Sequence, residues 1–203
     1  MAEVSIIDYG IGNLGSILNM YRKLGVAAER VAAPDAIRRA RRLILPGIGA
    51  FDACAQSLED SGLRPGLLAA VAAGTPLLGI CVGMQLLTKG SEEGSLPGLG
   101  LVDAYTRRFP PTPGLKVPHM GWNSVQWQEP GHPLAAELVG DVRFYFVHSY
   151  YVSCADPGDS LASAVHGLSF SAAIRSGNAM GVQFHPEKSH KFGLRLLRNF
   201  ARL

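Results

Sequence analysis

Two short stretches of the chain, Leu43 to Leu45 and Pro76 to Ile80, are apolar without alternation and lead directly into glycine-containing turns. A strand covered by helices on both faces has this pattern, because neither of its faces carries polar side chains. Such strands are typical of parallel sheets, in which a helix connects each strand to the next. The two stretches therefore predict a sheet buried between two layers of helices.

The first half of the chain alternates strand-like and helical segments. In chain order we expect a strand over 4–8, a helix over 14–24 that ends at Gly25, a strand over 27–31, a helix over 35–40 and a strand over 42–45. From about residue 98 extended stretches dominate, over 101–107, 122–127, 142–151 and 180–184, before a helix over 190–203. The expected fold is α/β: a single domain over 1–203 with a doubly wound, mostly parallel sheet flanked by helices, and additional antiparallel strands in the second half.

Composition argues against several classes of protein. Nineteen Lys and Arg against 16 Asp and Glu give a formal net charge of +3, too small an excess to predict a nucleic-acid or membrane partner. The three cysteines form no CxxC pair and the N-terminus has no signal-peptide pattern, which favours a cytoplasmic location. The uncharged stretch 66–87 is interrupted by Gly74 and Pro76, so we expect a helix and a buried strand there instead of a membrane span.

Residues 10–15 spell G-x-G-x-x-G between the first expected strand and the first expected helix. Such a motif can bind the pyrophosphate of a dinucleotide at the helix N-terminus, and Glu29 or Asp35 lies about 20 residues further on, where a ribose-binding acid is expected. The same glycines can equally form a tight turn, with Asn13 capping the helix through its side-chain oxygen. The segment alone leaves both interpretations open.

The sequence GICVG over residues 79–83 has the form of a nucleophile elbow. In an elbow, a sharp turn from strand to helix strains the backbone of the central residue, and flanking glycines remove the Cβ clashes. Cys81 is the central residue here, and the N-terminus of the following helix would stabilise its thiolate. We therefore predict that Cys81 is a nucleophile, whereas Cys54 and Cys154 lack such a turn and are interpreted as packing residues.

A nucleophilic cysteine needs a base, and the base needs an acceptor that orients it. The sequence QFHPE over residues 183–187 supplies both. Pro186 favours an extended conformation at His185, and in an extended segment residues two apart point the same way. We therefore expect Glu187 to accept a hydrogen bond from one ring nitrogen of His185 while the other nitrogen faces Cys81.

The remaining site predictions concern an oxyanion hole and the other histidines. Backbone N–H groups that stabilise a developing oxyanion are expected at Val82, which begins the elbow helix, and in the glycine-containing loop 46–49. The other histidines have no paired metal-binding spacing, so no metal site is expected; they are His119, His132, His148, His166 and His190.

These motifs carry a resemblance to a known family. GICVGMQLL around Cys81, GVQFHPEKS around His185 and LPGIGAF from Leu45 together resemble the class I, triad-type glutamine amidotransferases. DYGIGNLGS from Asp8, PHMGWN from Pro118 and YFVHSYYV from Tyr145 resemble the glutaminase subunits of imidazole glycerol phosphate synthases. The resemblance covers nearly the whole chain, and because DYGxGNL is the first turn of that family, it argues against a dinucleotide.

The resemblance implies hydrolysis of glutamine to glutamate and ammonia through a glutamyl thioester, without a cofactor. Cys81 would be the nucleophile, His185 the acid and base, and Glu187 the orienting carboxylate. Carried over by motif position, the backbone N–H groups of Ile48 and Val82 would form the oxyanion hole. Both residues differ from those frequent in the family, but they act through their backbone. The residues that would bind glutamine are Gly49, Gln85, His148, Ser149 and Tyr150.

The resemblance also implies a partner, because free ammonia would be protonated and lost in water. This partner is a (β/α)8-barrel cyclase subunit that forms a heterodimer with the glutaminase and uses the ammonia in histidine biosynthesis, making imidazole glycerol phosphate and an aminoimidazole carboxamide ribonucleotide. The expected interface residues are Asn13, Met120, Trp122 and Lys188. The alternatives are a glutaminase subunit of another pathway, or a non-catalytic scaffold with the same fold.

Overall fold

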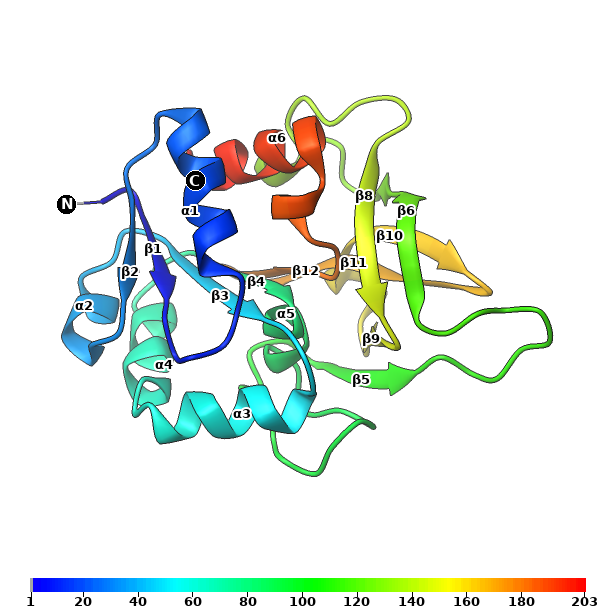
Figure 1. Ribbon diagram of the computed structural model, residues 1–203, viewed down its shortest axis with the longest axis horizontal. Coiled ribbons are helices and arrows are strands. Elements are labelled where there is room, and N and C mark those ends of the chain that lie inside the picture. Colours follow the sequence, from blue (N-terminus) through cyan, green and yellow to red (C-terminus); the bar gives the residue numbers. More distant parts are fainter. Residues whose placement is uncertain (1) are drawn as a thin grey trace.

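The computed structural model describes residues 2–203 (Figure 1). Its first half contains β1 (Val4–Ile7), α1 (Leu14–Leu24), β2 (Ala28–Val31), α2 (Pro34–Arg38), β3 (Leu43–Gly47), α3 (Phe51–Asp60), α4 (Arg64–Ala72), β4 (Leu77–Cys81) and α5 (Val82–Leu86). The second half contains β5 (Ala104–Arg108), β6 (His119–Ser124), β7 (Gln126–Trp127), β8 (Arg143–His148), β9 (Tyr150–Cys154), β10 (Ser160–His166), β11 (Leu168–Ser176), β12 (Ala179–Val182) and α6 (His190–Phe200).

Within residues 2–203 the main sheet has ten strands, and its central path follows the order β2-β1-β3-β4-β12-β11-β10-β7. The strands from β2 to β12 in this order are parallel, whereas β11 and β10 continue the sheet antiparallel. β9 pairs with β11 and β5, and β6 forms a separate antiparallel pair with β8. The expected α/β class, with a mostly parallel sheet and antiparallel additions in the second half, is confirmed.

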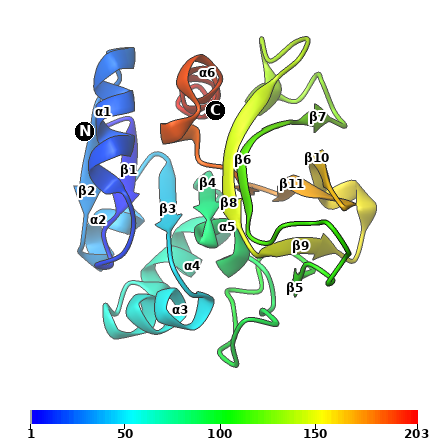
Figure 2. The same cartoon turned by 45° about the vertical axis from the view of Figure 1, so that its right-hand side comes forward.

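Helices cover both faces of the parallel strands. In both ribbon views α1 and α6 lie on one face, while α3, α4 and α5 lie on the other (Figures 1 and 2). Every residue of β3 and β4 is consequently buried. Each fully buried Leu or Ile contributes roughly 1.5–3 kcal/mol relative to an exposed one, which explains why these strands are apolar on both faces.

Two stretches that the sequence predicts as extended are each divided between two strands. The stretch 142–151 breaks at Ser149 into β8 and β9, and the stretch 122–127 breaks at Val125 into β6 and β7. In both cases the two halves enter different sheets. β6 and β8 pair with each other in the separate sheet, whereas β7 pairs with β10 and β9 pairs with β5 and β11 in the main sheet. Both stretches are extended, as predicted, but the prediction did not include the breaks within them.

The first turn of the chain is a tight glycine turn without a side-chain cap. Gly10 and Gly12 have φ values of +87° and +123°, and a Cβ on Gly12 would lie 2.8 Å from Pro46 Cβ. Asn13 occupies the N-cap position of α1 but its side chain makes no capping hydrogen bond, so that part of the prediction is wrong. At the other end, Gly25 terminates α1 in the left-handed conformation, as expected.

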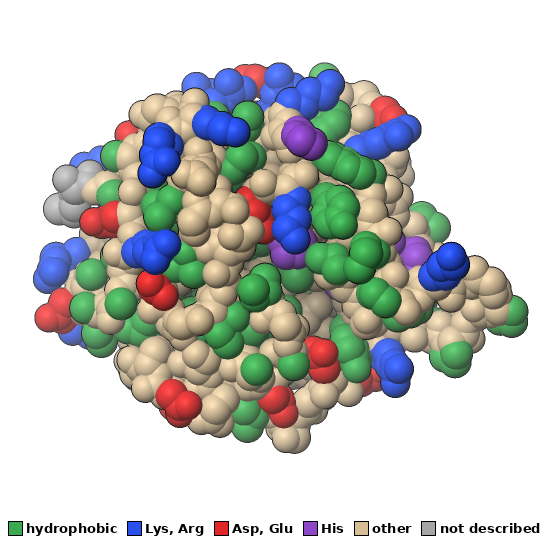
Figure 3. Space-filling view, viewed as in Figure 1, with side chains coloured by type: hydrophobic (Ala, Val, Ile, Leu, Met, Phe, Trp, Pro, Cys, Tyr) green, Lys and Arg blue, Asp and Glu red, His purple; other side chains and the backbone are tan. Residues whose placement is uncertain are grey.

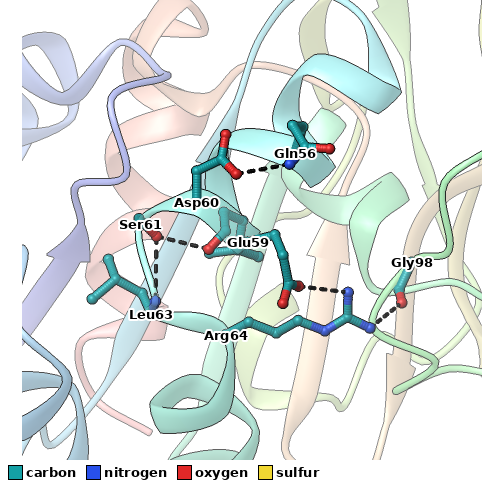
Figure 4. Close-up of polar contacts among 8 residues, drawn as sticks. Gln56, Glu59, Asp60, Ser61, Leu63, Arg64 and Gly98 are labelled. Carbon is teal, nitrogen blue, oxygen red and sulfur yellow. Dashed lines mark hydrogen bonds and ion pairs between the residues drawn. The ribbon is translucent and has the colours of Figure 1, made fainter.

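The connection between α3 and α4 is held by polar contacts (Figure 4). Ser61 Oγ donates to Leu58 O and accepts from the N–H of Leu63. Arg64 pairs with Glu59 of α3 and donates to the carbonyl of Gly98 at 2.9 Å, in the segment between α5 and β5. These contacts fix α3, which directly follows the loop at the end of β3.

The uncharged stretch 66–87 folds as predicted, with α4 in its first part and β4 in its second. Among residues 2–203, no helix is long and apolar enough to cross a membrane.

Candidate active site

Cys81 lies at the junction of β4 and α5, with backbone angles of φ 56° and ψ −114°. A positive φ is rare for a residue with a side chain, and the surrounding structure has to hold it there. The strained conformation predicted for an elbow is therefore present at Cys81. The helix that follows is short, five residues, and begins at Val82 directly after the cysteine.

The glycines around the cysteine allow three backbone segments to approach closely. A Cβ on Gly83 would lie 1.9 Å from Leu45 O, and a Cβ on Gly79 would lie 2.5 Å from Gly83 O. A Cβ on Gly47 would lie 2.4 Å from Gly83 N. The elbow is thus packed against the end of β3 at distances that only glycine permits.

His185 and Glu187 form a buried pair. His185 Nδ1 lies 2.8 Å from Glu187 Oε1, and the side chains are only 3% and 2% exposed. His185 is extended, as Pro186 predicts, but Glu187 belongs to a short 3-10 helix, Pro186–Lys188, and not to an extended segment. The expected pairing is present, although the backbone that brings it about differs from the expected one.

The backbone of His185 is fixed by Ser189, a residue that the sequence analysis did not single out. The hydroxyl of Ser189 donates to His185 O at 2.6 Å and accepts from the N–H of Tyr145 in β8 at 3.0 Å. The N–H of His185 in turn donates to Tyr145 O at 2.9 Å. These bonds attach the histidine to β8 on one side and to the start of α6 on the other.

Burial of His185 disfavours its charged form, but interactions with Cys81 and Glu187 outweigh this and raise its pKa to about 9. The other ring nitrogen, Nε2, is buried and forms no hydrogen bond. His185 and Cys81 line the same cavity. The site therefore combines a cysteine with an imidazole that favours the protonated state at neutral pH.

The cavity has a volume of about 440 Å³, within the range of small-molecule sites. The structure places both predicted oxyanion residues and every predicted glutamine-binding residue along it. Its lining residues are Ile48, Gly49, Cys81, Val82, Gln85, Glu93, Pro118, Val147, His148, Ser149, Tyr150, His185 and Lys188. Residues that lie far apart in the sequence thus meet around Cys81.

The backbone geometry at the predicted oxyanion positions differs between the two. Val82 is the first residue of α5, so its N–H has no acceptor within the helix. Ile48 follows the last residue of β3, and its carbonyl accepts a hydrogen bond from the Cys54 thiol at 3.2 Å. Gly49 next to it has a φ of +86°, which glycine tolerates without strain. Cys54 is buried, as expected, but it also holds this loop.

Glu93 is a further cavity residue that the sequence analysis missed. Its Oε2 accepts from the N–H of Phe51 at the start of α3, at 2.9 Å. In return, Asp52 of α3 accepts from the N–H groups of Ser95 and Leu96, and these bonds lower the pKa of Asp52. The reciprocal bonds hold the segment that carries Glu93 against the site.

Gln183 is also close to the cysteine. It is fully buried, its Nε2 lies 3.8 Å from Cys81 Sγ, and its Oε1 accepts from Gln85 Nε2 at 3.1 Å. The sequence analysis quoted Gln183 only as part of the segment around His185.

Of the residues predicted to contact a partner, Lys188 lines the cavity, and Met120 lies opposite the lining residue Val147 in the β6–β8 pair. Met120 and Trp122 of β6 are 63% and 47% exposed, and Lys188 is exposed and lines the cavity. Asn13 is half-buried at the start of α1 and is not among the lining residues. Hydrophobic side chains gather on the face over β6 and β8 (Figure 3).

Cys154, His132 and His190 lie outside this arrangement. Cys154 is half-buried in β9, and His132 caps a short helix by accepting from the N–H of Leu134. The ring of His190 stacks on that of Trp122. Within the part of the chain that the structure describes, no three His, Cys, Asp or Glu residues are arranged to hold a metal ion.

Comparison with known proteins identifies relatives over the full length of the chain. The family model for class I glutamine amidotransferases matches residues 5–203. The imidazole glycerol phosphate synthase subunit HisH 2 of Methanococcus maripaludis is 48% identical, covering 98% of both chains. Its namesake from Pseudomonas aeruginosa is 47% identical over 98% of this chain and 99% of its own. HisH of Bdellovibrio bacteriovorus is 46% identical over 98% of this chain and 100% of its own length.

Solved structures agree on the fold. A glutamine amidotransferase crystal structure superposes with a TM-score of 0.74 at 20% identity, covering 98% of this chain and 99% of its own. The structure of PurLQS from Thermotoga maritima gives a TM-score of 0.74 at 16% identity, covering 98% of this chain and 97% of its own. With the sequence relatives, these results show that the chain belongs to the class I glutamine amidotransferases and, within them, to the HisH subunits of imidazole glycerol phosphate synthase.

Proposed function

We propose that Cys81, His185 and Glu187 form the catalytic triad with which this chain hydrolyses glutamine. As a member of the HisH family, the chain is a glutamine-hydrolysing subunit of imidazole glycerol phosphate synthase and supplies ammonia for histidine biosynthesis. The observation that carries the triad is the buried His185–Glu187 pair on the same cavity as a cysteine with a positive φ. Activated nucleophiles are arranged in this way.

In the first half of the reaction, the Cys81 thiolate attacks the side-chain amide carbon of glutamine. The carbonyl oxygen becomes an oxyanion, for which the N–H of Val82 and the N–H of Ile48 are the proposed donors. His185 then gives its Nε2 proton to the departing nitrogen, ammonia leaves, and a glutamyl thioester remains on Cys81. Glu187 holds the ring by accepting from Nδ1, which leaves Nε2 as the proton donor.

In the second half, His185 has to act as a base toward water. Part of the rise in its pKa comes from the neighbouring Cys81. Because the thioester carries no charge, that contribution disappears once the first half is complete, and the pKa of His185 falls. The imidazole can then take a proton from water, which attacks the thioester carbon and releases glutamate and the Cys81 thiolate.

The cavity also supplies groups for the two ends of the amino acid. Glu93 lines it and has one carboxylate oxygen, Oε1, beyond the oxygen that accepts from Phe51, so it is suited to bind the α-ammonium group. We further propose that Gly49, Gln85, His148, Ser149 and Tyr150 position the rest of the substrate. All five line the cavity around Cys81.

The partner that we propose is a (β/α)8-barrel cyclase subunit, docked as a heterodimer on the face that carries Met120, Trp122 and Lys188. Lys188 lines the cavity, and Met120 and Trp122 are exposed on β6, which pairs with the lining strand β8. This supports the proposal, because an ammonia acceptor has to cover the opening to keep water out. Lys188→Glu should weaken binding of the cyclase subunit or the coupling of the two activities. Unchanged affinity and coupling would remove Lys188 from the interface.

Labelling of the thiols tests the triad directly. A glutamine chloroketone should modify Cys81 and leave Cys54 and Cys154 unmodified, as determined by mass spectrometry of the digested protein. Equal and slow modification of all three thiols would favour a non-catalytic scaffold.

Location in the cytoplasm stays a prediction from the cysteine pattern and the N-terminal sequence.

A further inference from the structure

A row of hydrogen bonds connects strand β6 to the cavity. His119 Nδ1 lies 2.9 Å from His148 Nε2, and His148 Nδ1 lies 2.7 Å from the carbonyl oxygen of Tyr150. The two residues are only 5% and 6% exposed. Along β6, His119 is buried whereas the next residue, Met120, is exposed, so His119 faces the interior.

Groups of fixed polarity lie at both ends of this row. The Tyr150 carbonyl can only accept, so His148 Nδ1 carries a hydrogen. At the other end, Asn123 Oδ1 accepts from the N–H of Ser124 and Asn123 Nδ2 donates to Val165 O, both at 2.8 Å. These bonds fix the orientation of the amide, so its Nδ2 is the atom that faces His119 Nε2 at 3.2 Å.

These ends determine the protonation of both rings. His119 Nε2 has to accept from Asn123, so its hydrogen is on Nδ1, which donates to His148 Nε2. His148 therefore accepts at Nε2 and donates at Nδ1 to Tyr150 O. Both histidines are neutral and in the Nδ1–H tautomer. Burial also favours the neutral form of both rings, since it lowers the pKa of His119 to about 4 and that of His148 to about 3.

The row ends at the segment where β8 gives way to β9. His148, Ser149 and Tyr150 line the cavity there, and the backbone passes from one sheet to the other. The Tyr150 carbonyl also accepts from Gln85 Nε2 at 3.3 Å. The orientation of the His148 ring thus bears directly on the wall of the cavity.

We propose that His119 is a positioning residue for glutamine. It donates to His148 Nε2 and so keeps that ring in the orientation whose Nδ1–H holds the carbonyl of Tyr150. The proposal rests on the proposed function, because the segment that it positions is the one assigned to glutamine. Without the donor, a buried acceptor on His148 is left unpaired, and the ring no longer has a single preferred position.

The first test compares two reagents on the isolated full chain. A glutamine chloroketone needs the binding site, whereas iodoacetamide needs only a reactive Cys81, so the ratio of their rate constants measures glutamine recognition. His119→Phe keeps the ring stacked on His166 and Phe146 but lacks the donor, and should lower this ratio about tenfold. His119→Asn, whose amide nitrogen can replace Nδ1 as donor, should restore most of it.

His166→Phe is the matched control. His166 belongs to the same aromatic cluster, but its ring Nε2 contacts Lys116 O and not the row of hydrogen bonds. This variant should leave the ratio unchanged. An equal loss in His166→Phe, no loss in His119→Phe, or a loss in His119→Asn as large as that in His119→Phe would each overturn the proposal.

The second test is independent of the variants and of catalysis. The ring 15N chemical shifts of the wild-type protein distinguish protonated from unprotonated ring nitrogens. We expect Nδ1–H and bare Nε2 in both His119 and His148 at neutral pH. An imidazolium or an Nε2–H tautomer at either ring would overturn the inference. Failure of the proposed function would instead appear as wild-type Cys81 that reacts with neither reagent.

Discussion

The substitution Gly83→Ala tests the packing of the elbow in a quantitative way. An ideal Cβ on Gly83 would lie 1.9 Å from Leu45 O, while real Cβ contacts essentially never fall below 3.0 Å. The helix α5 and the end of β3 would have to separate by at least the difference of 3.0 − 1.9 = 1.1 Å. Overpacking of this kind costs about 3 kcal/mol, at the upper end of its usual range, because the obstructing atom is backbone.

The matched control is Gly15→Ala in α1. Gly15 is exposed and helical, and nothing lies within 4 Å of a Cβ built on it. This variant should be more stable than the wild type by about 0.5 kcal/mol, because alanine loses less backbone entropy than glycine in a helix. Urea unfolding followed by circular dichroism measures both changes. A free energy of unfolding for Gly83→Ala within about 0.5 kcal/mol of wild type would refute the account of the elbow.

Three further predictions concern the reaction itself. Glu187→Gln keeps the volume of the side chain but removes the charge that orients His185. The kcat for glutamine in the complex should therefore fall about 10²–10⁴-fold with little change in KM. A change in KM alone would contradict this role. Because the pKa of His185 is raised to about 9, the ring loses its proton above that pH. The rate of pre-steady-state ammonia release should therefore decline above pH 9. A rate that stays level there would argue against His185 as the acid. Glu93→Gln should raise KM for glutamine about tenfold. The control Glu92→Gln alters only contacts with Arg107 and Arg108 outside the cavity and should leave KM unchanged. Equal effects of the two substitutions would remove Glu93 from the substrate site.

The features that the sequence predicts well are local ones. The elbow at Cys81 depends on glycines two residues to either side, and the orientation of His185 depends on the proline that follows it. The end of α1 at Gly25 is likewise set by a single residue that tolerates a positive φ. In each case the physical cause lies within a few residues of its effect, so a short sequence window contains it.

The features that sequence analysis missed depend on distant parts of the chain. Nothing near Ser149 marks the break between β8 and β9, because it arises from pairing with β6 on one side and with β5 and β11 on the other. Glu93 lies in an irregular segment and is held at the cavity by a hydrogen bond from Phe51 of α3. The two residues are 42 positions apart in the sequence. Such contacts follow from the tertiary structure and have no local pattern.

Ammonia release from glutamine by the chain in complex with its cyclase subunit tests the central claim most directly. Wild type and the Cys154→Ala control should release ammonia at similar rates, because Cys154 lies away from the cavity. Cys81→Ala should release none above background while it still binds the cyclase subunit. Ammonia release by Cys81→Ala at the wild-type rate would contradict the assignment of Cys81 as the nucleophile, and with it the proposed triad.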